Sequence, residues 1–343
     1  MSSSSGDNDL YQVITGHPHD IEELNPHIET VYQKGRLWVV DLKTSAPLAV
    51  RKNLRALTGK EKHFLYEGMF ISNKGQKAKK VNISHFVSQV SGENIKQDIV
   101  ELSSYETRFV ATPENTLALQ QTAARLNSLG YEVREHCYRD EVCSLIAEKK
   151  GLSKNNEVLM IMAHIDSVGE AFAGADDNAS GMAALLEMAR ILKDYDNQRT
   201  IRFFVTNGEE AGLIGSSHYA RSLEEENKIH DIQLALNLDM IGFNSTGVVE
   251  IETDPRFEET ARLMGDLASR YTSLRTKITL GAWGSDHLPF LQRGVPSLLT
   301  IEDWESKNPC YHEECDTVDL INFDYVAEIT KLNLSTILYK DQE

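Results

Sequence analysis

Three apolar runs constrain the fold of this chain more than any other feature. VLMIMAHID (158–166), TIRFFVT (200–206) and LALNLDMIG (234–242) are nearly continuous apolar segments, as is typical of strands covered on both faces. The segment 179–192, which lies between the first two, repeats apolar residues at helical spacing. Strands that alternate with helices form a mostly parallel sheet sandwiched by helices. The sequence therefore predicts an α/β fold from about residue 95 onward.

The charge and hydropathy of the chain exclude some classes of partner. The net charge of −17 argues against binding to nucleic acid or to an anionic membrane surface. No apolar run approaches the length of about eighteen residues that a membrane-spanning helix needs. The first residues, MSSSSGDND, have neither the basic nor the apolar region of a signal peptide. We therefore expect no nucleic acid and no membrane as partner.

The four cysteines form two close pairs, Cys137 with Cys143 and Cys310 with Cys315. Four buried free thiols would suit a cytosolic enzyme, whereas a zinc knuckle prefers a closer spacing within each pair. The even number and the pairing favour two short-range disulfides, which persist in oxidising compartments. We therefore expect two disulfides and a secreted or periplasmic protein.

Acidic and histidine side chains gather where the predicted strands end. In open α/β sheets, functional groups collect beyond the carboxyl ends of the strands. Taken singly, these motifs have ordinary explanations, because a pair of aspartates often caps a helix and a pair of glutamates is usually solvated. Their coincidence at successive strand ends instead indicates a metal site. The residues are His164, Asp166, Asp176, Asp177, Glu209, Glu210, Asp239 and, between two cysteines, His312.

The donor types suit two zinc ions. Zn²⁺ favours histidine nitrogen and carboxylate oxygen, and a pair of ions about 3.5–4 Å apart needs a bridging carboxylate. Of the neighbours Glu209 and Glu210, one would bind metal and the other would transfer protons. We expect Asp166, two residues after His164, and Asp316, four residues after His312, to orient those histidines.

With these motifs the chain resembles the M28 family of zinc aminopeptidases, of the secreted bacterial leucyl-aminopeptidase type. MAHIDS, GADDNASG, NGEEAGLIGS, NLDMIG and YHEECDT follow that family's order over roughly residues 95–343. The resemblance implies a three-layer αβα sandwich of the phosphorylase/hydrolase-like type, and removal of bulky apolar N-terminal residues from peptides. It assigns six roles: His164 and Asp239 bind one zinc, Glu210 and His312 bind the other, Asp177 bridges both, and Glu209 is the general acid/base.

The resemblance also points to the substrate pocket. Met240, Phe243 and Tyr311 are candidates for the pocket that receives the N-terminal side chain, with core packing as the alternative. Secreted bacterial members of the family often carry a tyrosine just before the Ser-Asp-His motif, whereas this chain reads LGAWGSDHLPF (280–290), with Ala282 or Trp283 at that place. We expect Trp283 to form a wall of the pocket. A cis peptide bond between Asp177 and Asn178 is a further implication.

Residues 1–80 differ from the rest and are expected to form a propeptide-like segment ahead of a catalytic domain over 81–343. Residues 51–80 carry nine Lys and Arg against two Asp and Glu, whereas the whole chain is strongly acidic. Opposite charges favour docking of the first segment on the second. KGQKAKK (74–80) is polar and lysine-rich, so an activating protease is expected to cut between Lys74 and Lys80. A permanent accessory layer is the alternative.

Two other functions remain open from the sequence. A glutaminyl cyclase, which is a single-zinc acyltransferase, shares the fold, and HLPFLQRGVP (287–296) is similar to its sequence. A non-catalytic peptidase-like binding domain is the second alternative, but such domains lose metal ligands and this chain retains the full set. The expected partners are peptides with a free N-terminus, and the expected state is a monomer.

Overall fold

The computed structural model describes residues 10–14, 28–34, 37–42, 55–56, 81–139, 142–169, 171–281 and 284–343. The chain divides into two compact units, Met1–Lys79 and Lys80–Glu343. The first unit contains an antiparallel sheet with the strand order β2-β3-β1-β4. Its strands are β1 Leu10–Ile14, β2 Ile28–Lys34, β3 Leu37–Leu42 and β4 Arg55–Ala56. The predicted cleavage segment Lys74–Lys80 lies outside the described residues.

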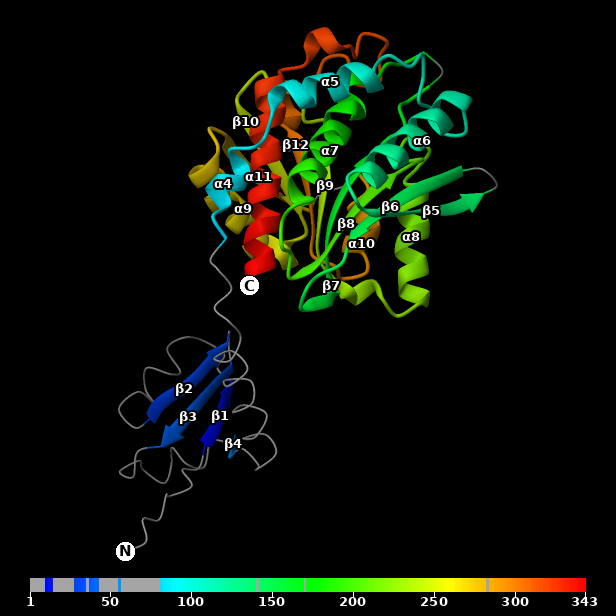
Figure 1. Cartoon of the computed structure of the whole chain (residues 1–343). Coiled ribbons are helices and arrows are strands. Elements are labelled where there is room, and N and C mark those ends of the chain that lie inside the picture. Colours follow the sequence, from blue (N-terminus) through cyan, green and yellow to red (C-terminus); the bar gives the residue numbers. More distant parts are fainter. Residues whose placement is uncertain are drawn as a thin grey trace, which may run out of the picture. The chain divides into compact units, whose positions relative to one another are not determined.

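An eight-stranded mixed sheet forms the centre of the second unit (Figure 1). The strand order is β11-β10-β12-β9-β7-β8-β6-β5. The central strands β12, β9, β7 and β8 are mutually parallel, and antiparallel pairs join them to β10 on one side and to β6 on the other. The strands are β5 Glu132–Arg139, β6 Val142–Lys149, β7 Lys154–His164, β8 Arg199–Thr206, β9 Ile232–Leu238, β10 Val248–Thr253, β11 Arg275–Leu280 and β12 Ser297–Glu302.

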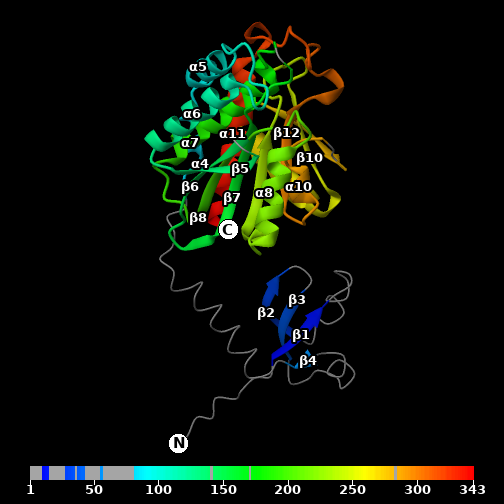
Figure 2. The ribbon, with the colours of Figure 1, turned by 90° about the vertical axis from the view of Figure 1, so that its right-hand side faces the viewer.

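Helices cover both faces of this sheet, as the alternation of side chains along β7 shows. Leu159 and Ile161 pack in the larger core, which also includes residues of five helices. These are α5 (Gly92–Leu102), α6 (Pro113–Ser128), α7 (Gly181–Leu192), α9 (Glu258–Tyr271) and α11 (Phe323–Gln342). Met160 and Met162 point the other way, into a second core with Tyr219 of α8 (Ile214–Glu225) and Phe290 of α10 (Leu288–Leu291). Figure 2 shows α8 and α10 on one side of the sheet and α6, α7 and α11 on the other. The predicted αβα sandwich with a mostly parallel mixed sheet is therefore confirmed.

The segment 179–192, predicted to be helical, contains α7, which spans Gly181–Leu192. Thr112 caps α6 by accepting a hydrogen bond from the backbone N–H of Asn115, and Pro113 is its first residue. The sequence did not predict α4, α5, α10 or β10. The main helices are α4 Ile83–Val87, α5 Gly92–Leu102, α6 Pro113–Ser128, α7 Gly181–Leu192, α8 Ile214–Glu225, α9 Glu258–Tyr271, α10 Leu288–Leu291 and α11 Phe323–Gln342. Short helical turns span Ala175–Ser180, Ile229–Asp231, Pro255–Phe257, Trp304–Ser306 and Val318–Leu320.

Candidate metal centre

The carboxyl ends of three neighbouring strands position the centre. His164 is the last residue of β7, and Asp239 directly follows β9. Glu209 and Glu210 lie in the turn that follows β8, three and four residues beyond Thr206. Because β8, β7 and β9 are adjacent and parallel, their ends meet at one edge of the sheet.

A wide helical turn before α7 positions Asp177. The turn spans Ala175–Ser180, and its peptide bond between Asp177 and Asn178 is cis, as the resemblance implied. Asp316 holds this turn from the far end of the chain, because its carboxylate accepts hydrogen bonds from the backbone N–H groups of Asp176 and Asp177, both at 3.0 Å. The structure thus places Asp316 behind Asp177 and not in hydrogen-bond contact with His312, the histidine that it was expected to orient.

Asp166 supports the glutamate pair. Its carboxylate accepts hydrogen bonds from the backbone N–H groups of Glu209 at 3.3 Å and Glu210 at 3.1 Å. Its backbone oxygen lies 3.0 Å from Nδ1 of His164, and its carboxylate lies 3.7 Å from the same nitrogen. A hydrogen bond from Nδ1 to this backbone oxygen leaves Nε2 of His164 free to act as a ligand.

Two donor groups meet at Asp177. Its Oδ1 lies 3.2 Å from Nε2 of His164, and Oδ1 of Asp239 lies 3.2 Å from the same nitrogen. Its Oδ2 lies 3.3 Å from Nε2 of His312, and Oε2 of Glu210 lies 3.2 Å from that nitrogen. The two oxygens of one carboxylate therefore face two histidines, each of which has a second carboxylate beside it.

The electrostatics of this cluster are those of a cation site. Burial, and next the charge of Asp177, raises the pKa of Glu210 to about 8. Burial also raises the pKa of Glu209 well above its usual range, and the charges of Asp239, Asp286 and Glu210 add to this effect. Although burial opposes it, the neighbouring carboxylates raise the pKa of His164. So many buried carboxylates repel one another unless cations offset their charge.

The residues present fit a pair of metal ions. The ligand atoms of His164, Asp177 and Asp239 lie within 4.8 Å of one another, and the same holds for Asp177, Glu210 and His312. Oε1 of Glu210 is buried without a hydrogen-bond partner among the described residues, which is an arrangement that a cation would satisfy. Histidine nitrogen with carboxylate oxygen is a donor set that suits zinc.

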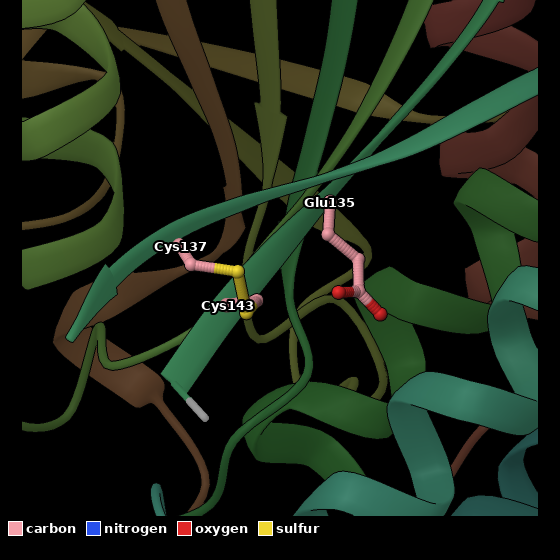
Figure 3. Close-up of side chains that lie close together, drawn as sticks. All are labelled: Glu135, Cys137 and Cys143. Carbon is pink, nitrogen blue, oxygen red and sulfur yellow. A yellow bond between two sulfur atoms is a disulfide. The ribbon is translucent and has the colours of Figure 1, made fainter. Parts of the chain in front are cut away.

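A further group of potential ligands does not suit a metal. Glu135, Cys137 and Cys143 lie together on the β5–β6 hairpin (Figure 3), where the backbone oxygen of Cys143 accepts a hydrogen bond from the side chain of Asn207, the residue after β8, at 3.0 Å. The two sulfur atoms are joined in a disulfide between directly paired residues, so neither is available as a thiolate ligand. This pairing was predicted from the sequence and is confirmed.

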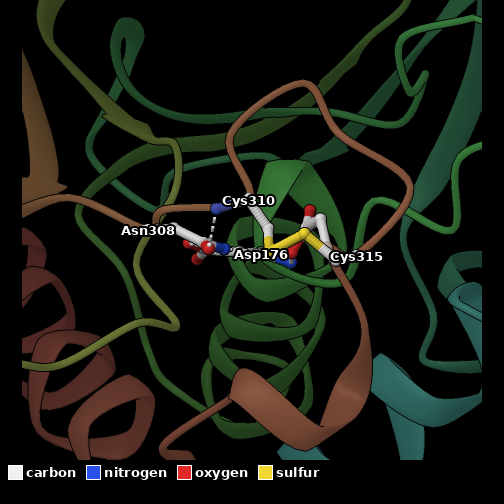
Figure 4. Close-up of a disulfide and its surroundings, with 5 residues drawn as sticks. Asp176, Asn308, Cys310 and Cys315 are labelled. Atoms are coloured by element: carbon white, nitrogen blue, oxygen red, sulfur yellow. Dashed lines mark hydrogen bonds between the residues drawn. A yellow bond between two sulfur atoms is a disulfide. The ribbon is translucent and has the colours of Figure 1, made fainter.

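The second predicted disulfide, between Cys310 and Cys315, is also present and closes the loop that carries His312. Asn308 ties this loop to the turn of Asp177. Its side-chain N–H group donates to Asp176 and to Asp316, both at 3.1 Å, while its side-chain oxygen accepts from the backbone N–H of Cys310 at 2.9 Å (Figure 4). The ring of His312 also stacks on Tyr311, with 3.9 Å between the centroids. These contacts hold His312, whose side chain is 38% exposed.

A cavity of about 500 Å³ adjoins the centre. Of the predicted pocket residues, Met240 and Tyr311 line it, Phe243 is not among the lining residues, and Trp283 lies outside the described residues. Sequence reasoning missed several lining residues. The cavity is lined by metal-site residues Asp177, Glu209, Glu210, Asp239 and His312, and also by Gly212, Leu213, Met240, Glu252, Thr279, Gly281, Gly284, Ser285, Leu299, Ile301, Trp304 and Tyr311.

The chain belongs to peptidase family M28, whose family model matches residues 144–337. It is therefore a peptide-bond hydrolase, and similarity to curated leucine aminopeptidases supports aminopeptidase activity. A probable leucine aminopeptidase 1 of Trichophyton verrucosum is 28% identical over 281 residues, which cover 73% of this chain and 74% of that protein.

No helix in the described part of the chain is long and apolar enough to cross a membrane.

Solved structures share the fold at low sequence identity. LapB from Legionella pneumophila superposes with a TM-score of 0.69 at 20% identity, covering 96% of this chain and 98% of that one. A zinc aminopeptidase from Bacillus subtilis gives a TM-score of 0.65 at 18% identity, covering 73% and 95%. A glutaminyl cyclase from Porphyromonas gingivalis gives 0.62 at 19% identity, covering 74% and 99%. The fold alone thus does not separate a peptidase from a cyclase.

Proposed function

We propose that the chain is a two-zinc aminopeptidase in which His164 and Asp239 hold one ion, Glu210 and His312 hold the other, and Asp177 bridges them. The observation that carries this proposal is the placement of the two Asp177 oxygens, each about 3.2–3.3 Å from a different histidine. A single tetrahedral zinc has too few positions for five protein ligands and a reacting water. The Bacillus subtilis structure of the same fold, described as a zinc aminopeptidase, supports the choice of metal.

When bound, a pair of zinc ions would polarise the scissile carbonyl and lower the pKa of the attacking water. Glu209 is the residue that moves the proton. It lines the cavity, and its side chain has no hydrogen-bond or ion-pair partner among the described residues. Glu209 takes a proton from the water as attack begins and donates it to the nitrogen of the leaving peptide.

Two other carboxylates of the cavity favour substrates with a free N-terminus. Asp239 and Glu210 face the same space as Glu209, so a protonated α-amine binds there with favourable electrostatics. A peptide whose amine is acetylated lacks this charge. Beside them, Met240, Leu299 and Ile301 form an apolar wall that suits a bulky N-terminal side chain.

The proposed activity is tested by comparing aminoacyl-p-nitroanilides with their N-acetylated forms and with a glutaminyl substrate. We expect hydrolysis of the free-amine substrates only, because acetylation removes the charge that the carboxylates bind. Mass spectrometry of products distinguishes hydrolysis from cyclisation. Cyclisation of the glutaminyl substrate without peptide hydrolysis would establish a cyclase, and binding without turnover would establish a binding domain.

We further propose that the protein acts outside reducing compartments, as a monomer. Two disulfides among the described residues support the first point, since such bonds persist in oxidising environments. One of them closes the loop of His312, so reduction would loosen a proposed metal ligand.

We also propose that residues 1–80 act as a propeptide that an activating protease removes near Lys74–Lys80. Residues 51–80 contain nine basic and two acidic residues, so their net charge is opposite in sign to that of the acidic remainder of the chain. Limited trypsin cleavage is expected to raise activity several-fold, because the basic segment would no longer compete for the acidic cleft. The released segment, added back, should inhibit more strongly at low salt, where charge attraction is less screened.

A variant with Lys74, Lys77, Lys79 and Lys80 replaced by glutamine provides the matched control for this prediction. It should resist cleavage in that segment and keep its initial activity during the same protease treatment. If clean removal of residues 1–80 leaves the activity of the native chain unchanged, the segment is a permanent accessory layer and not an inhibitor.

A further inference from the structure

The cavity beside the metal centre contains a carboxylate for which the proposed mechanism has no role. Glu252 lines this cavity together with the proposed ligands Asp177 and Asp239. It lies on β10, two strands away from β9, which leads to Asp239. Adjacent strands are about 4.8 Å apart, so β10 and β9 are separated by about 10 Å. A substrate side chain that starts near Asp239 has this span to cross before it meets Glu252.

The register of the sheet sets Glu252 into an apolar wall. Val249 and Ile251 of β10 pack in the larger core, so Glu252 points to the opposite face of the sheet. Glu252 is paired directly with Leu299 of β12, and directly opposed side chains lie on the same face. Leu299 in turn packs with Met240 and Ile301. The path from the metal centre to Glu252 is therefore lined by apolar side chains.

The carboxylate of Glu252 has no partner in the described part of the chain, where neither a hydrogen bond nor an ion pair engages it. Its strand neighbour Glu250 is well satisfied, because it binds Thr279, the backbone N–H of Trp304 and Lys277. Lys277 lies 3.3 Å from Glu250 and 3.4 Å from Glu305, so its charge is already shared.

Leaving a partly buried carboxylate unpaired costs free energy. Burial, and next the charges of Glu250 and Asp239, raises the pKa of Glu252 to about 7, although the charge of Lys277, which forms no ion pair with Glu252, partly opposes this rise. A ligand that brings a positive charge to this carboxylate would offset the cost, whereas a purely apolar ligand would bury the carboxylate further without pairing it. The chemistry of the cavity thus favours an occupant with an apolar stem and a cationic end.

We propose that Glu252 selects peptides whose N-terminal residue is lysine or arginine. The proposal rests on the aminopeptidase function and names its substrate class. The methylene groups of such a side chain contact Met240, Leu299 and Ile301, since long basic side chains bury their stems along apolar surfaces. The terminal cation then pairs with Glu252. Uncharged bulky residues fill the same wall but leave the carboxylate unpaired.

The test compares lysyl-p-nitroanilide with norleucyl-p-nitroanilide, whose side chains have the same number of carbons and differ by the ammonium group. We expect the native chain to favour lysine by about 10- to 100-fold in kcat/KM, the range for a hydrogen bond to a charged group. E252Q should bring the two substrates close to parity, mainly by reducing turnover of lysine. E252L should reverse the preference.

E305Q is the matched control, because Glu305 is a neighbouring carboxylate that pairs with Lys277, is exposed and does not line the cavity. It should keep the lysine preference of the native chain. Equal or better turnover of norleucine by the native chain would overturn the proposal, as would an unchanged preference in E252Q. Either result leaves the aminopeptidase function intact.

Absence of turnover on every aminoacyl substrate would instead refute the aminopeptidase function. Calorimetric binding of lysinamide and norleucinamide to the native chain and to E252Q then decides the role of Glu252. Tighter binding of lysinamide that E252Q abolishes supports the cation site, and equal binding of both amides overturns it.

Discussion

Replacement of Glu209 by glutamine is expected to lower kcat by about 10²–10⁴-fold, the range for general acid/base catalysis. The amide keeps the shape of the side chain and the backbone hydrogen bond to Asp166, but it cannot accept a proton from the attacking water. Glu209 also lies within 4.8 Å of ligand atoms of His164 and Glu210, but it belongs to neither donor group around Asp177, so we expect the metal content to be unchanged. Steady-state kinetics on an aminoacyl-p-nitroanilide, with elemental analysis of the same sample, measures both quantities.

Glu210→Gln is the matched control, since it makes the same chemical change one residue along the chain. Oε2 of Glu210 lies 3.2 Å from Nε2 of His312, within the second donor group, so this variant should lose metal affinity. Excess zinc should restore part of its activity, whereas zinc should not rescue Glu209→Gln. Near-normal kcat in Glu209→Gln would show that another group moves the proton.

The sequence predicted the parts of the centre that depend on strand order. His164, Asp239 and the Glu209–Glu210 pair follow long apolar runs, and the ends of parallel strands meet wherever such runs form one sheet. Asp177 and His312 lie outside the strands, and the sequence assigned them through their motifs. The structure adds the distances: Nε2 of His164 lies 3.2 Å from one carboxylate oxygen of Asp177, and Nε2 of His312 lies 3.3 Å from the other.

What the sequence could not predict depends on contacts between distant segments. Asp316 supports Asp177 across 139 residues and does not bind the nearby His312. Asn308 joins two loops through its side chain, and no local pattern marks a residue for that role. Both positions are set by tertiary packing, which periodicity and motif spacing do not report.

The sequence did not predict the cavity residue Glu252, and the reason is different. VVEIET (248–253) alternates apolar and acidic residues and forms β10, a strand that is not among those predicted from the sequence. Unless that strand is predicted, the sequence does not show on which face of the sheet Glu252 lies, nor that it is paired with Leu299. Alternation is the signal that identifies this strand, because a half-buried strand repeats with a period of two.

Removal of metal is expected to abolish activity and to lower the stability of residues 80–343. Each site that binds zinc only in the folded state stabilises it by about 2.7 kcal/mol when free zinc is 100 times Kd. Without cations, the carboxylates of Asp177, Glu210 and Asp239 remain close together, and each side chain is at most 10% exposed. A metal-free sample should therefore melt at a lower temperature than one with excess zinc. Calorimetry at two zinc concentrations and elemental analysis check this.

We expect two ions because the two oxygens of Asp177 belong to different donor groups. The native chain should bind two zinc ions, and Asp177→Ala should lower the affinity of both sites together, since each loses a ligand. Asp239→Ala should weaken mainly the site of His164, which leaves one ion bound to Asp177, Glu210 and His312. Glu252→Gln, in the same cavity but outside both groups, should keep two ions. Saturation of the native chain at one zinc with full activity would exclude the two-metal centre and make Asp177 a ligand of a single ion.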